Sequence, residues 1–323
     1  MTDAGASSLF VSDRAARIAN YDRGWSALCD SVVASVARGM PLTELLARYD
    51  AMIGAYTGFI PDAVLRQIPR VDLGHFGGHP APNRLAVRNG RYLAVTQPQN
   101  TNEFFDVIAS VVDPEVDCIV EFGSGLGFNL ARLRLRLPHQ PITYIACEPT
   151  EHGRRAAELA FSADPRAKLQ THAFDYAEPD LDFLGRFRKI IAFTVHSVEQ
   201  MPVLGETFYR KLLATSVAHC FHLEPVGWQR YTELARSVLD MHRDAETWQA
   251  FCQRMEFVIE DSQLIKNAAQ WSVFCGYNTD LLSIIAGVVD RGEAALTAVS
   301  YEILGLNPLN PSTLIAWRRT RQR

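Results

Sequence analysis

Three glycines at alternate positions, Gly123, Gly125 and Gly127, lie between two apolar segments of the chain. The apolar residues before them predict a buried strand over 117–122, and those after them predict a helix over 128–137. Glycines in such a turn allow a tight bend and let a ligand approach the backbone closely. Because the turn leads into a helix N-terminus, its free N–H groups favour a carboxylate or a phosphate. The pattern therefore predicts a ligand-binding loop.

The spacing of the glycines discriminates between two kinds of cofactor. A dinucleotide loop has the pattern GxGxxG, but Phe128 stands three residues after Gly125. The loop instead has the pattern GxGxG, with the carboxylate of Glu121 two residues before it. A negative side chain at that point suits a cationic or amino-bearing ligand better than a pyrophosphate. Both features favour S-adenosylmethionine over a nicotinamide dinucleotide.

Three short motifs resemble those of the class I S-adenosylmethionine-dependent methyltransferases: the loop at 121–127, Glu148 at the end of the next apolar run, and Phe174-Asp175-Tyr176. The resemblance implies that the loop lines the methionine end of the cofactor and that Glu148 binds the ribose hydroxyls. It also implies that Asp175 reaches the adenine amine. As alternatives, Glu148 is a plain polar strand end and Asp175 is a turn residue. The residues expected to bind the cofactor are Glu121, Gly123, Ser124, Gly125, Gly127, Asn129, Glu148, Phe174, Asp175, Tyr176 and Thr194.

Two further strands, expected over 189–195 and 218–223, are apolar along their length but end in polar residues. In a doubly wound sheet, ligands bind outside the carboxyl ends of the strands. Methyl transfer is an in-line displacement, and a histidine titrating near neutrality is a natural base for the acceptor's proton. We expect His196, which follows the first of these strands, to act as a base or to orient the acceptor. The expected catalytic residues are His196, Glu199, His222 and Glu224.

The polar residues at these strand ends have two other interpretations. They could serve only to satisfy loop backbone groups or to hold the substrate. His222 and Glu224 share one face of their strand, so together with His196 they could also form a two-histidine, one-carboxylate metal site. The spacing permits this metal site but does not require it, and no metal is assigned.

The elements that must position these residues alternate between strand and helix from residue 117 onward, which predicts an α/β fold. We expect a doubly wound, Rossmann-like sheet of seven strands. Its last two strands are predicted over 296–303 and 313–317, separated by the turn Asn307-Pro308-Leu309-Asn310-Pro311. They match the antiparallel final hairpin of the methyltransferase family, so the last strand is expected to be antiparallel.

Two domains are predicted, with a boundary near residue 100. Residues 1–100 form a helical N-terminal region, with helical periodicity over 12–68 and a short strand pair around the Asn89-Gly90 turn. Residues 101–323 form the S-adenosylmethionine-binding domain, with a helical insertion at 231–278. We expect the N-terminal helices and the insertion to roof the pocket, which suits a small molecule or a short peptide.

Composition narrows the class of protein further. The net charge of −4 disfavours binding to nucleic acid, and no run of about 20 apolar residues predicts a membrane span. The six cysteines are scattered without a CxxC pair, and the first 13 residues lack the pattern of a signal peptide. We therefore expect a cytoplasmic protein. Analogy alone suggests a homodimer through the N-terminal helices.

These observations predict a methyltransferase that transfers a methyl group to oxygen, nitrogen or carbon of a small metabolite, with a histidine assisting. The chain is loosely similar to bacterial small-molecule and sugar O-methyltransferases. Methylation of nucleic-acid bases is disfavoured because no Asn/Asp-Pro-Pro-Tyr/Phe motif follows the fourth strand, where Thr194-Val195-His196-Ser197 stands. The alternatives are a non-catalytic S-adenosylmethionine-binding regulatory or assembly protein of the same fold and a nicotinamide dehydrogenase.

Overall fold

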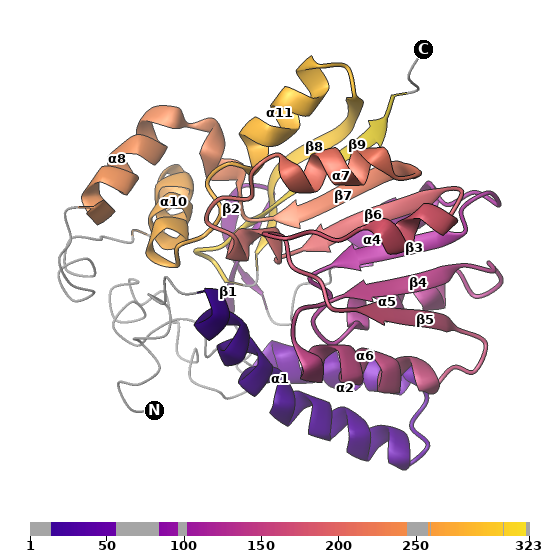
Figure 1. The fold of residues 1–323 in the computed structure, drawn as a ribbon. Coiled ribbons are helices and arrows are strands. Elements are labelled where there is room, and N and C mark those ends of the chain that lie inside the picture. The colour runs from indigo at the N-terminus through magenta and orange to yellow at the C-terminus, as the bar shows by residue number, and fades with distance from the viewer. Residues whose placement is uncertain are drawn as a thin grey trace.

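The computed structural model describes residues 14–55, 84–95, 102–243, 258, 260–305 and 307–320. Its strands are β1 (Arg84–Arg88), β2 (Arg91–Val95), β3 (Cys118–Phe122), β4 (Thr143–Cys147), β5 (Lys168–His172), β6 (Ile190–Val195), β7 (Val217–Glu224), β8 (Ala294–Gly305) and β9 (Ser312–Arg319). They form one sheet in the order β2-β1-β8-β9-β7-β6-β3-β4-β5 (Figure 1).

Strands β3 to β7 run parallel, as the alternation of strands and helices predicts. All five residues of β3 are buried, which is typical of a parallel strand covered on both faces. Strand β3 pairs with both β4 and β6, so the direction of winding reverses beside it. In an open α/β sheet, ligands bind outside the carboxyl ends of the strands at such a reversal. The glycine loop follows β3 at this point.

The described sheet has nine strands, so the expected count of seven is wrong. The short strand pair expected around Asn89-Gly90 does form as β1 and β2, but it joins the main sheet through Val87 opposite Gly305 and Arg88 opposite Leu304. Strand β9 pairs antiparallel with both β7 and β8. The pairing of β1 with β8 involves only two residues of each strand and leaves no periodic signal in the sequence. The extension of the sheet by β1 and β2 could therefore not be predicted.

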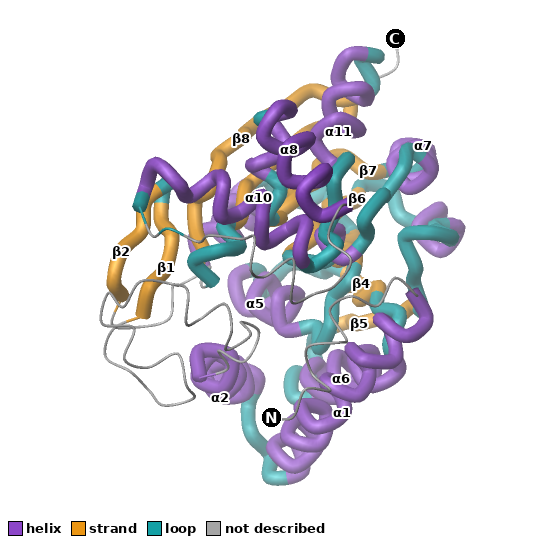
Figure 2. The backbone as a smooth tube through the Cα atoms, turned by 90° about the vertical axis from the view of Figure 1, so that its left-hand side faces the viewer, coloured by secondary structure: helices purple, strands orange, loops and turns teal. Residues whose placement is uncertain are grey.

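Helices cover both faces of the sheet. The described helices are α1 (Arg14–Ala37), α2 (Leu42–Ala55), α4 (Asn102–Ser110), α5 (Phe128–Arg136), α6 (Glu151–Ser162), α7 (Thr207–Ala214), α8 (Thr232–Arg243), α10 (Leu264–Phe274) and α11 (Leu281–Asp290). Helices α4, α5 and α6 pack on one face, and α7 and α11 pack on the other. Helix α1 lies along α6, on the side away from the sheet, in both views of the backbone (Figures 1 and 2).

The helical N-terminal pattern is confirmed for α1 and α2, whereas residues 56–83 lie outside the described residues. The insertion expected at 231–278 contains α8 and α10, and Trp271 is buried in it, as is Trp228 just before it. Trp248, in the same insertion, lies outside the described residues. The domain boundary near residue 100 stays a prediction.

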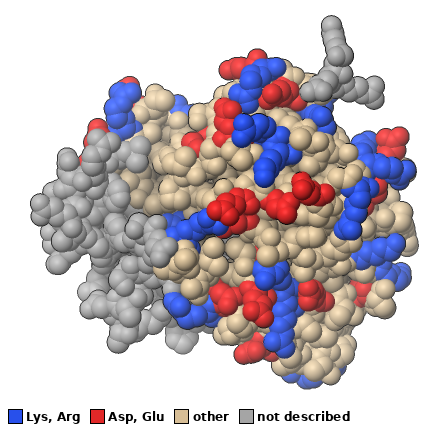
Figure 3. Space-filling model, in the orientation of Figure 1, with Lys and Arg blue, Asp and Glu red and all other residues tan. Residues whose placement is uncertain are grey.

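Charged side chains of both signs are interspersed on the face shown in Figure 3, over the helices that cover the sheet. Within the part of the chain that the structure describes, no helix is both long and apolar enough to cross a bilayer.

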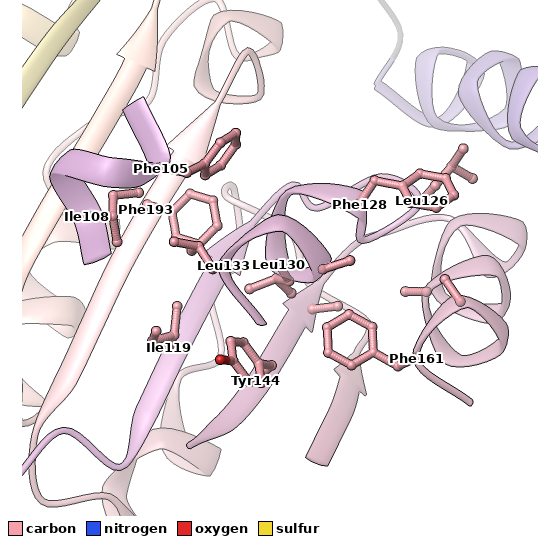
Figure 4. Close-up of a cluster of buried hydrophobic side chains, with 14 of the residues drawn as sticks. Phe105, Ile108, Ile119, Leu126, Phe128, Leu130, Leu133, Tyr144, Phe161 and Phe193 are labelled. Carbon is pink, nitrogen blue, oxygen red and sulfur yellow. The ribbon is translucent and has the colours of Figure 1, made fainter. Parts of the chain in front are cut away.

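Two apolar clusters fix the sheet between its helical layers. Along β3, Ile119 belongs to the cluster under α4, α5 and α6, whereas Val120 belongs to the cluster under α7 and α11. This assignment follows from the two-residue period of a strand. Figure 4 shows the first cluster, in which Leu130 of α5 lies between that helix and the sheet, and Phe128 lies at the start of α5. The Phe128 ring stacks on Tyr49 of α2, with ring centroids 4.2 Å apart. The start of α5, and with it the glycine loop, is therefore anchored by core packing.

Candidate functional site

The glycine loop after β3 depends on its glycines for both conformation and space. Gly123, Gly125 and Gly127 have φ values of 71°, 52° and 74°, in the left-handed region. A Cβ at Gly123 would lie 2.3 Å from the Cβ of Ser197, and a Cβ at Gly127 would lie 2.6 Å from that of Ala157. The loop therefore packs directly against the end of β6 and against α6.

Buried polar atoms without partners lie in and beside this loop. The Glu121 side chain is fully buried, and its Oε1 accepts a hydrogen bond from Asn129 Nδ2 at 2.7 Å. Glu121 Oε2 and Ser124 Oγ are buried without a hydrogen-bond partner. Burial raises the pKa of Glu121 well above its usual range. A buried polar atom without a partner costs free energy, and both residues bear this cost behind the loop, because neither lines the cavity described below.

Glu148, at the end of β4, ties the loop to the start of α6. Its Oε2 accepts a hydrogen bond from Gly125 N at 2.9 Å, and its Oε1 accepts from Thr150 N and Oγ1 at 3.1 and 2.6 Å. Burial raises the pKa of the Glu148 carboxyl, although the Thr150 and Gly125 hydrogen bonds oppose that shift. The same carboxylate lines the cavity described below, as a ribose-binding residue must.

The residues expected to hold the adenine lie together after β5. Phe174 packs against Phe122, with ring centroids 4.9 Å apart, and the Tyr176 hydroxyl donates to the Phe122 carbonyl at 3.0 Å. Asp175 forms an ion pair with Arg14 of α1. The acid assigned to the adenine amine thus has a protein partner from the N-terminal helix.

A cavity of about 190 Å³ lies between the loop and α1. Of the residues expected to bind the cofactor, the cavity is lined by Gly123, Gly125, Glu148, Phe174, Asp175 and Tyr176. The other five lie outside its lining: Glu121, Ser124, Gly127, Asn129 and Thr194.

Helix α1 forms the roof of the cavity, and none of its residues was predicted as a site residue. A Cβ at Gly125 would lie 3.4 Å from the Trp25 ring, so the indole covers the loop. Asp22 accepts hydrogen bonds from the backbone N and Nδ1 of His152, at 3.0 and 2.9 Å, at the start of α6. A signal was present in the sequence: cavity-lining residues recur at helical spacing, at Arg14, Arg17, Ile18, Tyr21 and Trp25.

His196 lies at the opposite side of the cavity, beyond the end of β6, and has the left-handed φ of 50°. Its Nδ1 lies 3.0 Å from Glu199 Oε2. A carboxylate only accepts, so Nδ1 carries the proton. Burial disfavours the charged ring, but the Glu199 carboxylate outweighs burial, and the pKa of His196 is raised. The predicted histidine and carboxylate are therefore brought together as a dyad.

Two residues of the final hairpin form hydrogen bonds with this dyad, and neither was predicted as a site residue. Ser312 Oγ lies 2.6 Å from His196 Nε2, and Asn310 Nδ2 donates to Glu199 Oε2 at 3.3 Å. Both ring nitrogens of His196 are thus hydrogen-bonded. The turn at 307–311 was singled out only for its prolines and asparagines, and no local pattern connects it to residue 196, more than 100 positions away.

Glu224 positions the segment that carries the dyad. Its carboxylate accepts hydrogen bonds from the backbone N of Ser197, Val198 and Glu199, at 3.1, 3.2 and 3.2 Å. These N–H groups belong to the start of the 3-10 helix η4 (Val198–Gln200). Burial, with a smaller contribution from Glu199, raises the pKa of Glu224 to about 7. The residue acts on the site through this backbone and does not line the cavity.

His222 lies in the core rather than at the cavity. Its Nδ1 shares a hydrogen bond with Thr194 Oγ1 at 2.9 Å, and its Nε2 shares one with the Tyr209 hydroxyl at 2.8 Å. Burial lowers the pKa of His222 to about 3. Among the described residues there is no group of three metal-ligating side chains, so the structure does not assemble His196, His222 and Glu224 into a metal site.

The parallel part of the sheet is continued by an antiparallel hairpin, with a glycine loop after its first parallel strand and acids after the next two. This is the order in which the sequence resemblance to class I methyltransferases places the cofactor-binding motifs. No protein-family model matches the chain, and no curated protein sequence matches it.

Solved structures with a similar fold share little sequence with this chain. Magnesium protoporphyrin IX methyltransferase (ChlM) from Synechocystis PCC 6803, with bound S-adenosylhomocysteine, is 9% identical, with a TM-score of 0.41 over 68% of this chain and 83% of its own. The O-methyltransferase NcsB1 from neocarzinostatin biosynthesis, in complex with S-adenosylmethionine and 2-hydroxy-5-methyl naphthoic acid, is 12% identical, with a TM-score of 0.37 over 68% of this chain and 55% of its own.

A Rhodobacter sphaeroides protein named as a zinc-dependent alcohol dehydrogenase is also 12% identical, with a TM-score of 0.41 over 69% of this chain and 92% of its own. The match spans about half the length of NcsB1. Likenesses of this size carry no functional argument, and the function is inferred from the residues of this chain.

Proposed function

We propose that this protein is an S-adenosylmethionine-dependent methyltransferase that acts on a small-molecule acceptor. The observation that carries the proposal is that Gly123 and Gly125 of the glycine loop line one cavity together with Glu148 and Asp175. The left-handed glycines would let the methionine end of the cofactor lie against the loop backbone. Glu121 would support the loop from behind, through the hydrogen bond that it accepts from Asn129.

The cavity residues supply the remaining contacts that the cofactor needs. Glu148 would accept hydrogen bonds from the ribose hydroxyls, and Phe174 would lie against the adenine. Asp175 would accept from the adenine amine once its ion pair with Arg14 opens. When bound, the cofactor supplies a methyl group on a sulfonium centre.

His196 is proposed to hold the proton that the acceptor releases. Its Nδ1 proton is directed to Glu199, which stabilises the ring in its charged form and fixes its tautomer. Its Nε2 receives the Ser312 hydroxyl. The acceptor's proton must therefore reach Nε2 by displacing that hydroxyl or by passing through it. An oxygen acceptor fits this arrangement best, because its hydroxyl proton is the one that a neutral imidazole can receive.

Binding of S-adenosylhomocysteine, measured by isothermal titration calorimetry, tests the proposal. We expect binding by the wild type and none by Gly125→Arg, because the new side chain would enter the space between the loop and Trp25. Arg48→Gln, which changes an exposed residue of α2, serves as the control for a surface substitution. Wild-type protein that binds NADH and no adenosyl ligand would refute the proposal, and adenosyl binding without methyl transfer to any hydroxyl-bearing acceptor would favour a non-catalytic binding protein.

A further inference from the structure

Arg17 is a cationic residue in the roof of the cavity that no step above uses. It lies on α1, is half-buried, and lines the cavity together with His196 and Gln200. Its Nη1 donates to the Gln200 carbonyl at 2.5 Å. Its Nη2 lies 3.5 Å from the position of a Cβ on Gly276, so the guanidinium packs against the backbone at that glycine.

Within the described part of the chain, no carboxylate forms an ion pair with Arg17. This distinguishes it from Arg14 in the same roof, which pairs with Asp175. The nearby carboxylate of Glu199 is already engaged by His196 and Asn310. A neutral carbonyl orients the guanidinium but does not balance its charge, and it uses only one of five N–H donors.

We propose that Arg17 binds a carboxylate inside the cavity. A planar guanidinium held at one edge presents its remaining donors as a fork, the geometry that matches a carboxylate. This inference rests on the proposed function for the position of the cofactor. Two sources can supply the group: the α-carboxylate of the cofactor's methionine moiety, or a carboxylate on an acidic acceptor bound beside His196.

Two pairs of ligands that differ only in the carboxylate distinguish these sources. The first pair is S-adenosylhomocysteine and its decarboxylated analogue. The second pair is salicylate and salicylamide, added to protein saturated with S-adenosylhomocysteine. Each is titrated calorimetrically into the wild type, Arg17→Gln and Arg17→Lys, with Arg48→Gln as a control that removes an exposed charge.

If the cofactor supplies the carboxylate, Arg17→Gln lowers the affinity for S-adenosylhomocysteine by about tenfold or more and leaves the affinity for the decarboxylated analogue unchanged. If the acceptor supplies it, the wild type binds salicylate but not salicylamide, and Arg17→Gln loses that preference. Arg17→Lys should retain part of either effect. The inference fails if the wild type shows no preference for the carboxylate in either pair, or if Arg17→Gln keeps the wild-type preference.

Failure of the inference differs from failure of the proposed function. Wild-type protein that binds S-adenosylhomocysteine while Arg17→Gln binds it equally, with no salicylate preference, would remove only the role of Arg17. Wild-type protein that binds no adenosyl ligand would contradict the function itself. In that case salicylate and salicylamide are titrated into the unliganded protein, where the same comparison of variants still decides the inference.

Discussion

His196 shows how individual residues of this site depend on their neighbours. Its left-handed backbone costs about 1 kcal/mol for a residue with a Cβ. The three N–H groups that follow it all donate to Glu224, which holds the segment in place against that cost. The ring is then fixed by Glu199 and Ser312. Glu224 therefore holds the backbone beside His196, whereas the pKa of His196 is raised mainly by Glu199, with a smaller contribution from Glu224.

Replacing Glu199 with Gln should move the pH dependence of turnover. The carboxylate raises the pKa of His196 against the opposing effect of burial, so the neutral amide should let that pKa fall. A histidine that acts as a neutral base loses activity as the pH falls through its pKa. The acid limb of kcat/KM against pH should therefore shift to lower pH in Glu199→Gln, and the maximum rate should fall about tenfold or more.

The control for this profile is Glu44→Gln, which neutralises an exposed carboxylate on α2 and should leave the limb in place. An acid limb at the same pH in Glu199→Gln and the wild type would show that His196 does not set it.

The glycine loop and its acids could be predicted because their signal is local: spacing within seven residues, followed by a strand end. The placement of His222 could not. The two-residue period of a strand correctly places His222 on one face of β7, but it does not predict which residues cover that face. Tyr209 of α7 covers it, and Trp317 Nε1 of β9 lies 3.4 Å from His222 Nε2. Ser312 reaches His196 through a strand pairing that no local pattern encodes.

Among the elements, α1 has the largest effect on the cavity. It contacts the site at separate points along its length: Arg14 at Asp175, Arg17 at Gln200 and Trp25 at Gly125. The sequence predicted a helix here but not the face it presents, because the stripe that lines the cavity mixes cationic, aromatic and aliphatic residues. Cys29 and Val32 continue α1 into the apolar cluster under the sheet. One end of α1 is thus anchored in the core, and the other end roofs the cavity.

Asp22→Asn should weaken the contact of α1 with the start of α6. Burial alone would raise the pKa of Asp22, but the backbone and side-chain hydrogen bonds from His152 lower it. The carboxylate also faces the N-terminus of α6, where negative charge is favourable. Loss of the charge should weaken the packing of α1 against α6 by about 1 kcal/mol. The backbone amides over residues 14–25 should then exchange about fivefold faster.

Hydrogen exchange followed by mass spectrometry measures this effect. Asp30→Asn, at an exposed position of the same helix, is the matched control. Equal exchange over 14–25 in the two variants would show that the Asp22–His152 contact does not hold α1 down.

At the scale of the whole molecule, the central strands are joined through buried polar contacts as well as through apolar packing. His222 of β7 is bonded to Thr194 of β6 and to Tyr209 of α7, and all three are almost wholly buried. The alternation of strand and helix was enough to predict the parallel part of the sheet. The β1–β2 extension was missed because its register depends on residues more than 200 positions apart.

This central position makes His222 a source of acid sensitivity. Burial lowers its pKa to about 3 in the folded protein, whereas an unfolded histidine titrates near 6.5. As the pH falls below about 6.5, the unfolded chain therefore binds a proton that the folded chain does not, and stability is lost until the pH approaches 3. Between pH 7 and pH 5 the wild type should lose about 2 kcal/mol of unfolding free energy from this residue alone.

His222→Gln removes the titrating group while keeping a polar side chain between Thr194 and Tyr209. The variant should be less stable than the wild type at pH 7, by about 1–3 kcal/mol, because the ring's hydrogen bonds to Thr194 and Tyr209 are lost or distorted. Its further loss between pH 7 and pH 5, measured by urea unfolding, should nevertheless be about 2 kcal/mol smaller than that of the wild type. His139→Gln, at an exposed position, should lose as much as the wild type does. Equal losses in His222→Gln and the wild type would mean that His222 takes up its proton in the folded state, and that the core around it is open to water.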